Sequence, residues 1–133
     1  MKKIIRNGTI VTSGDVFKAD LQLDGETITV IADRIDPSPG DEVIDARDCL
    51  VFPGGIDVHT HLAWPFQSTG TADDFESGSR AAAVGGITSI INFTNPRKGQ
   101  TLLENLKEWK DKAKPSAIDY GFHSISVSLW KGH

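Results

Sequence analysis

The sequence predicts an α/β protein with two parts. A small all-β, sandwich-type module is expected over residues 1–52, followed by the first β-α-β-α-β units of a TIM-type (β/α)8 barrel over residues 53–133. Two observations favour this fold class. Short apolar segments separated by Asn-Gly and Asp-Gly turn signals fill the first part, and strand-like and helix-like patterns alternate after Pro53. A complete barrel needs eight strands and about 250 residues, so the barrel is expected to be incomplete in this chain.

The N-terminal module is expected to consist of short strands joined by tight turns. Residues 4–5 and 9–11 flank Asn7-Gly8, which is a strong hairpin signal, so these two segments are predicted to pair with each other. Asp24-Gly25 predicts a second hairpin. The other strands are expected at residues 21–23, 27–31, 43–46 and 50–52.

The second part begins with a strand over residues 53–61 and continues with a helix. Thr71 or Asp73 is the expected N-cap of this helix, because both residue types accept hydrogen bonds from the first free N–H groups. Gly85-Gly86 is the expected end of the helix. The β-branched run at residues 87–93 then predicts a buried strand.

A second helix and a third strand complete the predicted β-α-β-α-β order. Thr101 and Glu104 have the spacing of a capping box at the start of this helix. Trp109 is expected to lie in the core, because it belongs to an apolar face with helical spacing. The members of that face are Leu102, Leu106, Trp109 and Ala113. The third strand is expected within residues 117–129.

Composition and charge exclude several classes of function. The formal net charge is -4 and no long basic run occurs, which argues against a nucleic-acid-binding protein. No apolar stretch is long enough for a signal peptide or a membrane span. Cys49 is the only cysteine, so an intrachain disulfide is impossible, and the residue is expected to be a small buried hydrophobe. These features predict a cytoplasmic protein.

His59 and His61 are the residues most indicative of chemistry. Side chains alternate along a strand, so these two imidazoles are expected to lie on one face, together with Asp57. Two neutral imidazoles at a strand end provide half of a metal site. A pair of polar side chains with no ligand remains the alternative interpretation. Asp57 either orients one of the imidazoles or is simply solvated.

Several motifs together resemble the amidohydrolase superfamily, and within it the dihydropyrimidinase and D-hydantoinase family. The resemblance covers nearly all of this chain but only about the first third of a family member. Its motifs are Arg6-Asn7-Gly8-Thr9-Ile10-Val11, Val43-Ile44-Asp45-Ala46, Phe52-Pro53-Gly54-Gly55-Ile56-Asp57-Val58-His59-Thr60-His61-Leu62, Asp73-Asp74-Phe75-Glu76-Ser77-Gly78, Gly85-Gly86-Ile87-Thr88 and Ile118-Asp119-Tyr120-Gly121-Phe122-His123.

The resemblance implies a binuclear metal hydrolase. His59 and His61 would hold the more buried of two divalent metal ions, with Zn²⁺ as the expected metal. The implied activity is hydrolysis of a cyclic amide by metal-activated hydroxide, which opens a hydantoin or dihydropyrimidine ring to an N-carbamoyl amino acid. The other family ligands come from later strands, so no catalytic residue is assigned here and this stretch alone is expected to be inactive. A homo-oligomer, either a dimer or a tetramer, is implied by the family alone.

The loop after the metal strand resembles a hydrophobic lid over the substrate. Leu62, Trp64 and Phe66 would form this lid, with ordinary surface packing as the alternative. The Ala63-Trp64 pair departs from the family pattern, and Asn92 stands where many relatives have aspartate. His123 matches a family histidine and is expected to be structural.

Three alternatives to this function remain open from the sequence. An allantoinase or a dihydroorotase-type cyclic amidohydrolase would have a similar site. A dihydropyrimidinase-like scaffold protein would have lost its metal ligands, and the retention of both His59 and His61 argues against that reading. The third is a catalytically inactive fragment, because two histidines alone hold zinc weakly.

Overall fold

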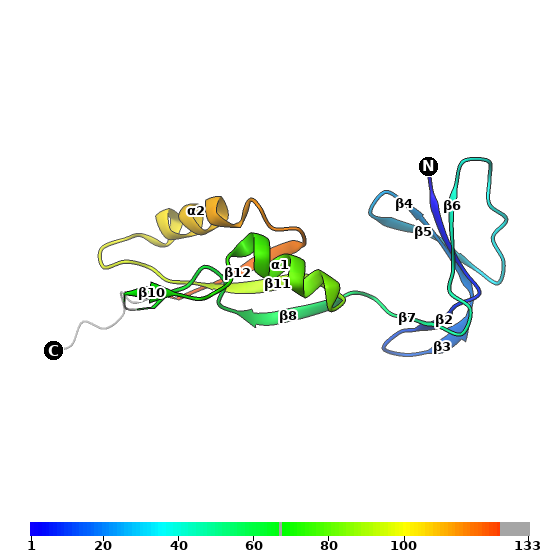
Figure 1. The fold of residues 1–133 in the computed structure, drawn as a ribbon, viewed down its shortest axis with the longest axis horizontal. Helices are drawn as coiled ribbons and strands as arrows, with labels where there is room; N and C mark the ends of the chain where they lie inside the picture. Colours follow the sequence, from blue (N-terminus) through cyan, green and yellow to red (C-terminus); the bar gives the residue numbers. More distant parts are fainter. Residues whose placement is uncertain (67, 126–133) are drawn as a thin grey trace. The chain divides into compact units, whose positions relative to one another are not determined.

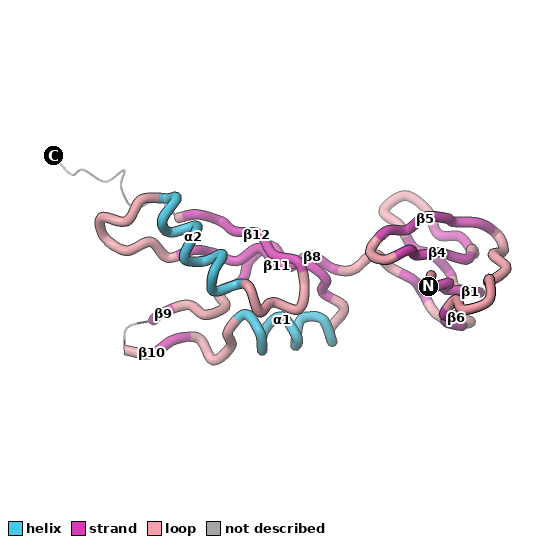
Figure 2. Tube along the Cα trace, turned by 90° about the horizontal axis from the view of Figure 1, so that it is seen from above, coloured by secondary structure: helices cyan, strands magenta, loops and turns pink. Residues whose placement is uncertain are grey.

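The computed structural model describes residues 1–66 and 68–125, which form two compact units. The first unit is Met1–Pro53 and the second begins at Gly54. Each unit has its own sheets, as the ribbon and tube views show (Figures 1 and 2). Each also has its own hydrophobic core. No helix in the described ranges has the length and apolar character needed to cross a membrane.

The first unit contains two small sheets. One has the strand order β5-β4-β1-β6, with β1 antiparallel to β4 and parallel to β6. The other has the order β3-β2-β7. Ile10 from the second sheet and Leu21 from the first share one buried cluster, so the core lies between the sheets. The strands are β1 (Lys3–Arg6), β2 (Thr9–Val11), β3 (Val16–Lys18), β4 (Asp20–Asp24), β5 (Thr27–Ala32), β6 (Glu42–Asp45) and β7 (Leu50–Val51).

The predicted hairpin at Asp24-Gly25 is confirmed, because β4 and β5 pair antiparallel on either side of it. The predicted hairpin at Asn7-Gly8 is wrong, since β1 and β2 belong to different sheets. Asn7 does adopt a left-handed backbone, with φ at 64°. Its N–H donates to Asp20 Oδ1 at 2.9 Å and its side chain donates to Asp45 at 2.8 Å. These long-range bonds direct the chain from one sheet to the other.

Cys49 also differs from its prediction. The side chain is exposed, while the backbone N–H and carbonyl groups of the residue are both hydrogen-bonded. Its N–H donates to the carbonyl of Ala46 and its carbonyl accepts from the N–H of Thr9, both at 3.0 Å. Cys49 therefore closes a turn ahead of β7 and is not part of the core.

The second unit is a parallel three-stranded sheet with the order β12-β11-β8, covered on one side by two helices (Figure 1). Its core is formed by Phe75, Ile90, Trp109 and Ala113, which come from both helices and the middle strand. The predicted β-α-β-α-β order is confirmed. The elements are β8 (Gly55–Thr60), β9 (Pro65–Phe66), β10 (Thr69–Gly70), α1 (Phe75–Val84), β11 (Ile87–Thr94), α2 (Leu102–Ala113) and β12 (Asp119–Ser124).

Helix boundaries follow local signals closely. The N-cap of α1 is Asp74, whose carboxylate accepts from the N–H groups of Glu76 and Ser77, so neither predicted cap was correct. The predicted end of α1 at Gly85 is confirmed. The predicted capping box of α2 at Thr101 is also present.

The buried face of α2 follows the i, i+4 spacing from Asn105 through Trp109 to Ala113. Trp109 is 1% exposed, as predicted, whereas Leu102 in the first turn is 52% exposed. The third predicted strand corresponds to β12, and the end of its predicted range, from residue 126, lies outside the described residues.

Candidate metal centre

The C-terminal end of β8 brings His59 and His61 together. His59 lies in the strand, and His61 follows Thr60, the last residue of β8. The two Nε2 atoms are 3.2 Å apart and the ring centroids are 5.1 Å apart. Both side chains therefore point to the same side of the sheet. Their Nε2 atoms converge on one point.

Phe93 on the neighbouring strand β11 packs against both imidazoles. Its ring centroid lies 4.5 Å from that of His59 and 5.1 Å from that of His61, with the latter pair stacked at 21°. His123 on β12 approaches the same phenylalanine at 4.8 Å. One aromatic ring thus contacts three histidines and restricts the orientation of the candidate ligand pair.

The two imidazoles fit part of a zinc site. Two nitrogens each about 2.0–2.1 Å from a tetrahedral Zn²⁺ lie about 3.3 Å apart, which is close to the 3.2 Å seen between the Nε2 atoms. Within residues 1–66 and 68–125, no group of three or more potential ligand side chains is assembled. Within these described residues, His59 and His61 are therefore a pair of candidate ligands.

Asp57 acts on the backbone and makes no hydrogen bond to either imidazole. Its Oδ1 accepts from the N–H of His59 at 3.1 Å. The sequence-based idea that Asp57 orients a ligand ring therefore needs correction: the carboxylate touches the peptide group of His59 instead.

Asn92 is a residue of the site whose role the sequence did not reveal. It is fully buried on β11. Its Oδ1 accepts from the Thr60 hydroxyl at 2.9 Å and from the Leu62 N–H at 2.7 Å. These partners lie immediately before and after His61 in the chain.

His123 reaches the ligand strand from β12. Its Nε2 lies 3.0 Å from the carbonyl oxygen of Val58, which can only accept, so this nitrogen carries a proton. The register of β8 against β11 is irregular between Ile90 and Asn92, and Val58 lies opposite this irregularity. His123 thus supports the backbone next to His59.

The three residues of the expected lid lie in different environments. Trp64 is half-buried, and its ring is 4.7 Å from His61 and 6.0 Å from Trp109. Leu62 is also half-buried and packs on the core. Phe66 in β9 is 60% exposed. Trp64 therefore connects the histidine pair to the core, while Phe66 is the most accessible of the three.

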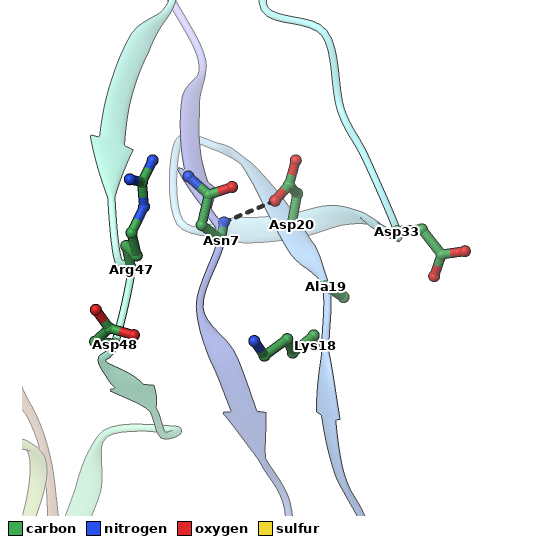
Figure 3. A pocket seen from close by; sticks show the side chains of 7 residues that line it. All are labelled: Asn7, Lys18, Ala19, Asp20, Asp33, Arg47 and Asp48. Carbon is green, nitrogen blue, oxygen red and sulfur yellow. Dashed lines mark hydrogen bonds between the residues drawn. The ribbon is translucent and has the colours of Figure 1, made fainter.

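A separate polar hollow of about 440 Å³ lies in the first unit (Figure 3). Burial would raise the pKa of Asp20, but hydrogen bonds from the N–H groups of Asn7 and Ile35 and from Arg6 lower it below the ordinary value. Asp20 therefore remains charged and links Asn7, Ile35 and Arg6 through these hydrogen bonds. The lining residues are Asn7, Lys18, Ala19, Asp20, Asp33, Arg47 and Asp48.

Comparison with known proteins places these features in a family. Residues 50–129 match the model of the amidohydrolase family. The chain is 55% identical over 124 residues to a D-hydantoinase of Geobacillus stearothermophilus, which covers 92% of this chain and 26% of that protein. It is 42% identical over 128 residues to a dihydropyrimidinase of Dictyostelium discoideum, which covers 96% of this chain and 25% of that protein.

Solved structures show the same similarity. The crystal structure of dihydropyrimidinase from Brevibacillus agri NCHU1002 superposes with a TM-score of 0.90 at 46% identity, over 95% of this chain and 27% of that one. This likeness confirms the predicted fold, a β module followed by the first units of a barrel. The chain spans about a quarter of the length of these relatives. Because the family model matches more than half of its residues, the chain belongs to the amidohydrolase family, as its motifs suggested.

Proposed function

We propose that the protein is a metal-dependent cyclic amidohydrolase that opens a hydantoin or dihydropyrimidine ring to an N-carbamoyl amino acid. The observation that carries this proposal is the convergence of the His59 and His61 Nε2 atoms to 3.2 Å at the end of β8. The relatives named D-hydantoinase and dihydropyrimidinase support the substrate class. They favour it over allantoinase, dihydroorotase and scaffold functions.

The role of the two histidines follows from their chemistry. His59 and His61 bind a cation as neutral imidazoles through Nε2, with Phe93 packed on both rings. Divalent ions, when bound, supply the water activation and carbonyl polarisation that amide hydrolysis requires. We infer two ions from the family resemblance. Zn²⁺ is the expected metal, because nitrogen ligands at a tetrahedral spacing suit zinc. Leu62, Trp64 and Phe66 then cover the exocyclic group of the substrate.

Three further features belong to the same proposal. Residues 1–52 and 53–133 form separate domains, which is supported by the division into compact units at Pro53. A homo-oligomer, dimer or tetramer, is inferred from the family. A cytoplasmic location is inferred from the sequence, in which Cys49 is the only cysteine.

Ring-opening assays on the full-length protein test the function. With Zn²⁺ present, the protein is expected to hydrolyse hydantoin or dihydrouracil, and His59→Ala is expected to reduce kcat/KM by at least a thousandfold. Val58→Ala is the matched control, because it changes the adjacent residue of the same strand while leaving both imidazoles in place. Normal turnover by His59→Ala would contradict the proposal.

A further inference from the structure

Asn92 has a polar side chain in the buried interior of the second unit, where side chains are normally apolar. It is 0% exposed and lies on β11, the middle strand of the parallel sheet. Burying an amide is unfavourable unless its donors and acceptors are all paired. The hydrogen bonds of Asn92 therefore show what the residue stabilises.

The amide of Asn92 pairs with the backbone on the C-terminal side of His61. Its Oδ1 accepts from the N–H of Leu62 at 2.7 Å, and its Nδ2 lies 3.4 Å from the carbonyl oxygen of the same residue. The N–H of Leu62 can only donate, which fixes the orientation of the amide. Both backbone polar groups of Leu62 thus face one side chain.

This arrangement continues the sheet beyond the point where the strand pairing ends. Strand β8 ends at Thr60, which pairs with Asn92 in the register of β8 and β11. His61 lies just past this last pair. Beyond His61, at Leu62, the side chain of Asn92 therefore makes the hydrogen bonds that the backbone of a neighbouring strand would otherwise make.

Two additional hydrogen bonds of Asn92 involve residues next to His61 in the chain or in space. The Thr60 hydroxyl donates to Oδ1 of Asn92 at 2.9 Å, and Nδ2 donates to the carbonyl of Phe93 at 2.9 Å. Phe93 in turn stacks on the His61 ring. One buried amide thus bonds to the residue before His61, to the residue after it, and to the backbone of the phenylalanine that stacks on it.

We propose that Asn92 is a positioning residue that holds His61 Nε2 at the spacing from His59 needed to bind a metal ion. This inference rests on the proposed function, since it assigns His59 and His61 as ligands. Asn92 makes no contact with either imidazole and acts through the backbone. Groups that orient metal ligands typically change metal affinity by 10- to 100-fold when they are removed.

The chemistry of the contacts predicts which substitutions are tolerated. Asn92→Asp keeps both acceptor contacts, to the Thr60 hydroxyl and the Leu62 N–H, and loses the donor contacts to the carbonyl oxygens of Leu62 and Phe93. Asn92→Leu has a similar size but keeps neither. Val58→Ala changes another residue of β8 whose side chain cannot hydrogen-bond to Asn92, so it serves as the matched control.

Metal titration of the full-length protein tests the inference. After removal of bound metal with a chelator, Co²⁺ is added while its visible absorption spectrum is recorded, and Zn²⁺ affinity is measured by competition. Asn92→Leu is expected to weaken affinity 10- to 100-fold and to alter the Co²⁺ spectrum. Asn92→Asp is expected to weaken affinity less than Asn92→Leu, and Val58→Ala is expected to remain within about threefold of the wild type. If Asn92→Leu fails to fold, Asn92→Ser replaces it, because its short side chain leaves Leu62 unbridged.

The possible outcomes separate this inference from the proposed function. An unchanged Zn²⁺ affinity and Co²⁺ spectrum in a folded Asn92→Leu protein would overturn the positioning role, while metal binding by the wild type would leave the function standing. A wild-type protein that binds metal no better than His61→Ala would overturn the function itself.

Discussion

Asp20 is the residue whose charge matters most in the first unit. Its side chain is buried and accepts from the N–H groups of Asn7 and Ile35, both at 2.9 Å. Arg6 Nε lies 3.3 Å from the same carboxylate. Desolvation would raise the pKa of Asp20, but these donors together lower it. The ionised form of Asp20 is therefore the one that these hydrogen bonds stabilise.

Asp20→Asn is expected to lower the free energy of unfolding by about 3 kcal/mol at neutral pH, because it leaves Arg6 and the N–H groups of Asn7 and Ile35 poorly paired. The folded pKa of Asp20 lies below the ordinary value. Its stabilisation is therefore complete above about pH 4 and is lost as the pH falls through the lower folded pKa. Urea unfolding should show a difference between the two proteins that is large at pH 7 and smaller at pH 3. A difference that does not depend on pH would contradict this account.

The candidate site could be predicted from the sequence only in part. The shared face of His59 and His61 follows from strand alternation, and the structure does bring these residues together. The role of Asn92 depends on contacts with residues 30 and 32 positions away. No local pattern contains that information, because it arises only when β8 and β11 lie side by side.

The packing of α1 against the loop after β8 depends on a glycine. A Cβ atom at Gly78 would overlap the side chain of Leu62. Leu62 packs on the core and its backbone is bonded to Asn92, so it has little room to move. Gly78 therefore allows helix α1 to approach the candidate lid closely.

A double-mutant cycle tests this contact. Gly78→Ala alone is expected to destabilise the protein by about 1–2 kcal/mol, because overpacking outweighs the gain of roughly 1 kcal/mol in helix propensity. In a Leu62→Ala background the same change should be neutral or stabilising, since the space has been vacated. Thermal unfolding of the wild type, the two single variants and the double variant gives the coupling free energy between positions 62 and 78. Equal effects of Gly78→Ala in both backgrounds would show that the two residues do not compete for space.

At the scale of elements, predictions succeeded where the signal was local. The capping box at Thr101 and the helix end at Gly85 depend on neighbours within a few residues, and both were correct. The turn at Asn7-Gly8 has an equally clear local signal, but Asp20 and Asp45 bind Asn7 and the strands separate. Tertiary hydrogen bonds thus overrode a local preference.

At the scale of the whole molecule, the chain provides the beginning of a larger architecture. It spans about a quarter of its D-hydantoinase and dihydropyrimidinase relatives. Two histidines alone bind zinc weakly, and stable sites have three or four protein ligands. The activity proposed for the protein therefore depends on ligands beyond His59 and His61, because no three potential ligand side chains cluster within residues 1–66 and 68–125.

The metal content of the purified full-length protein tests the central claim most directly. Elemental analysis is expected to find bound divalent metal in the wild type and at least one equivalent less in His59→Ala and in His61→Ala. The double variant should lose no more than either single one, because both imidazoles hold the same ion. Wild-type metal content in all three variants would contradict the assignment of the β8 terminus as a metal centre.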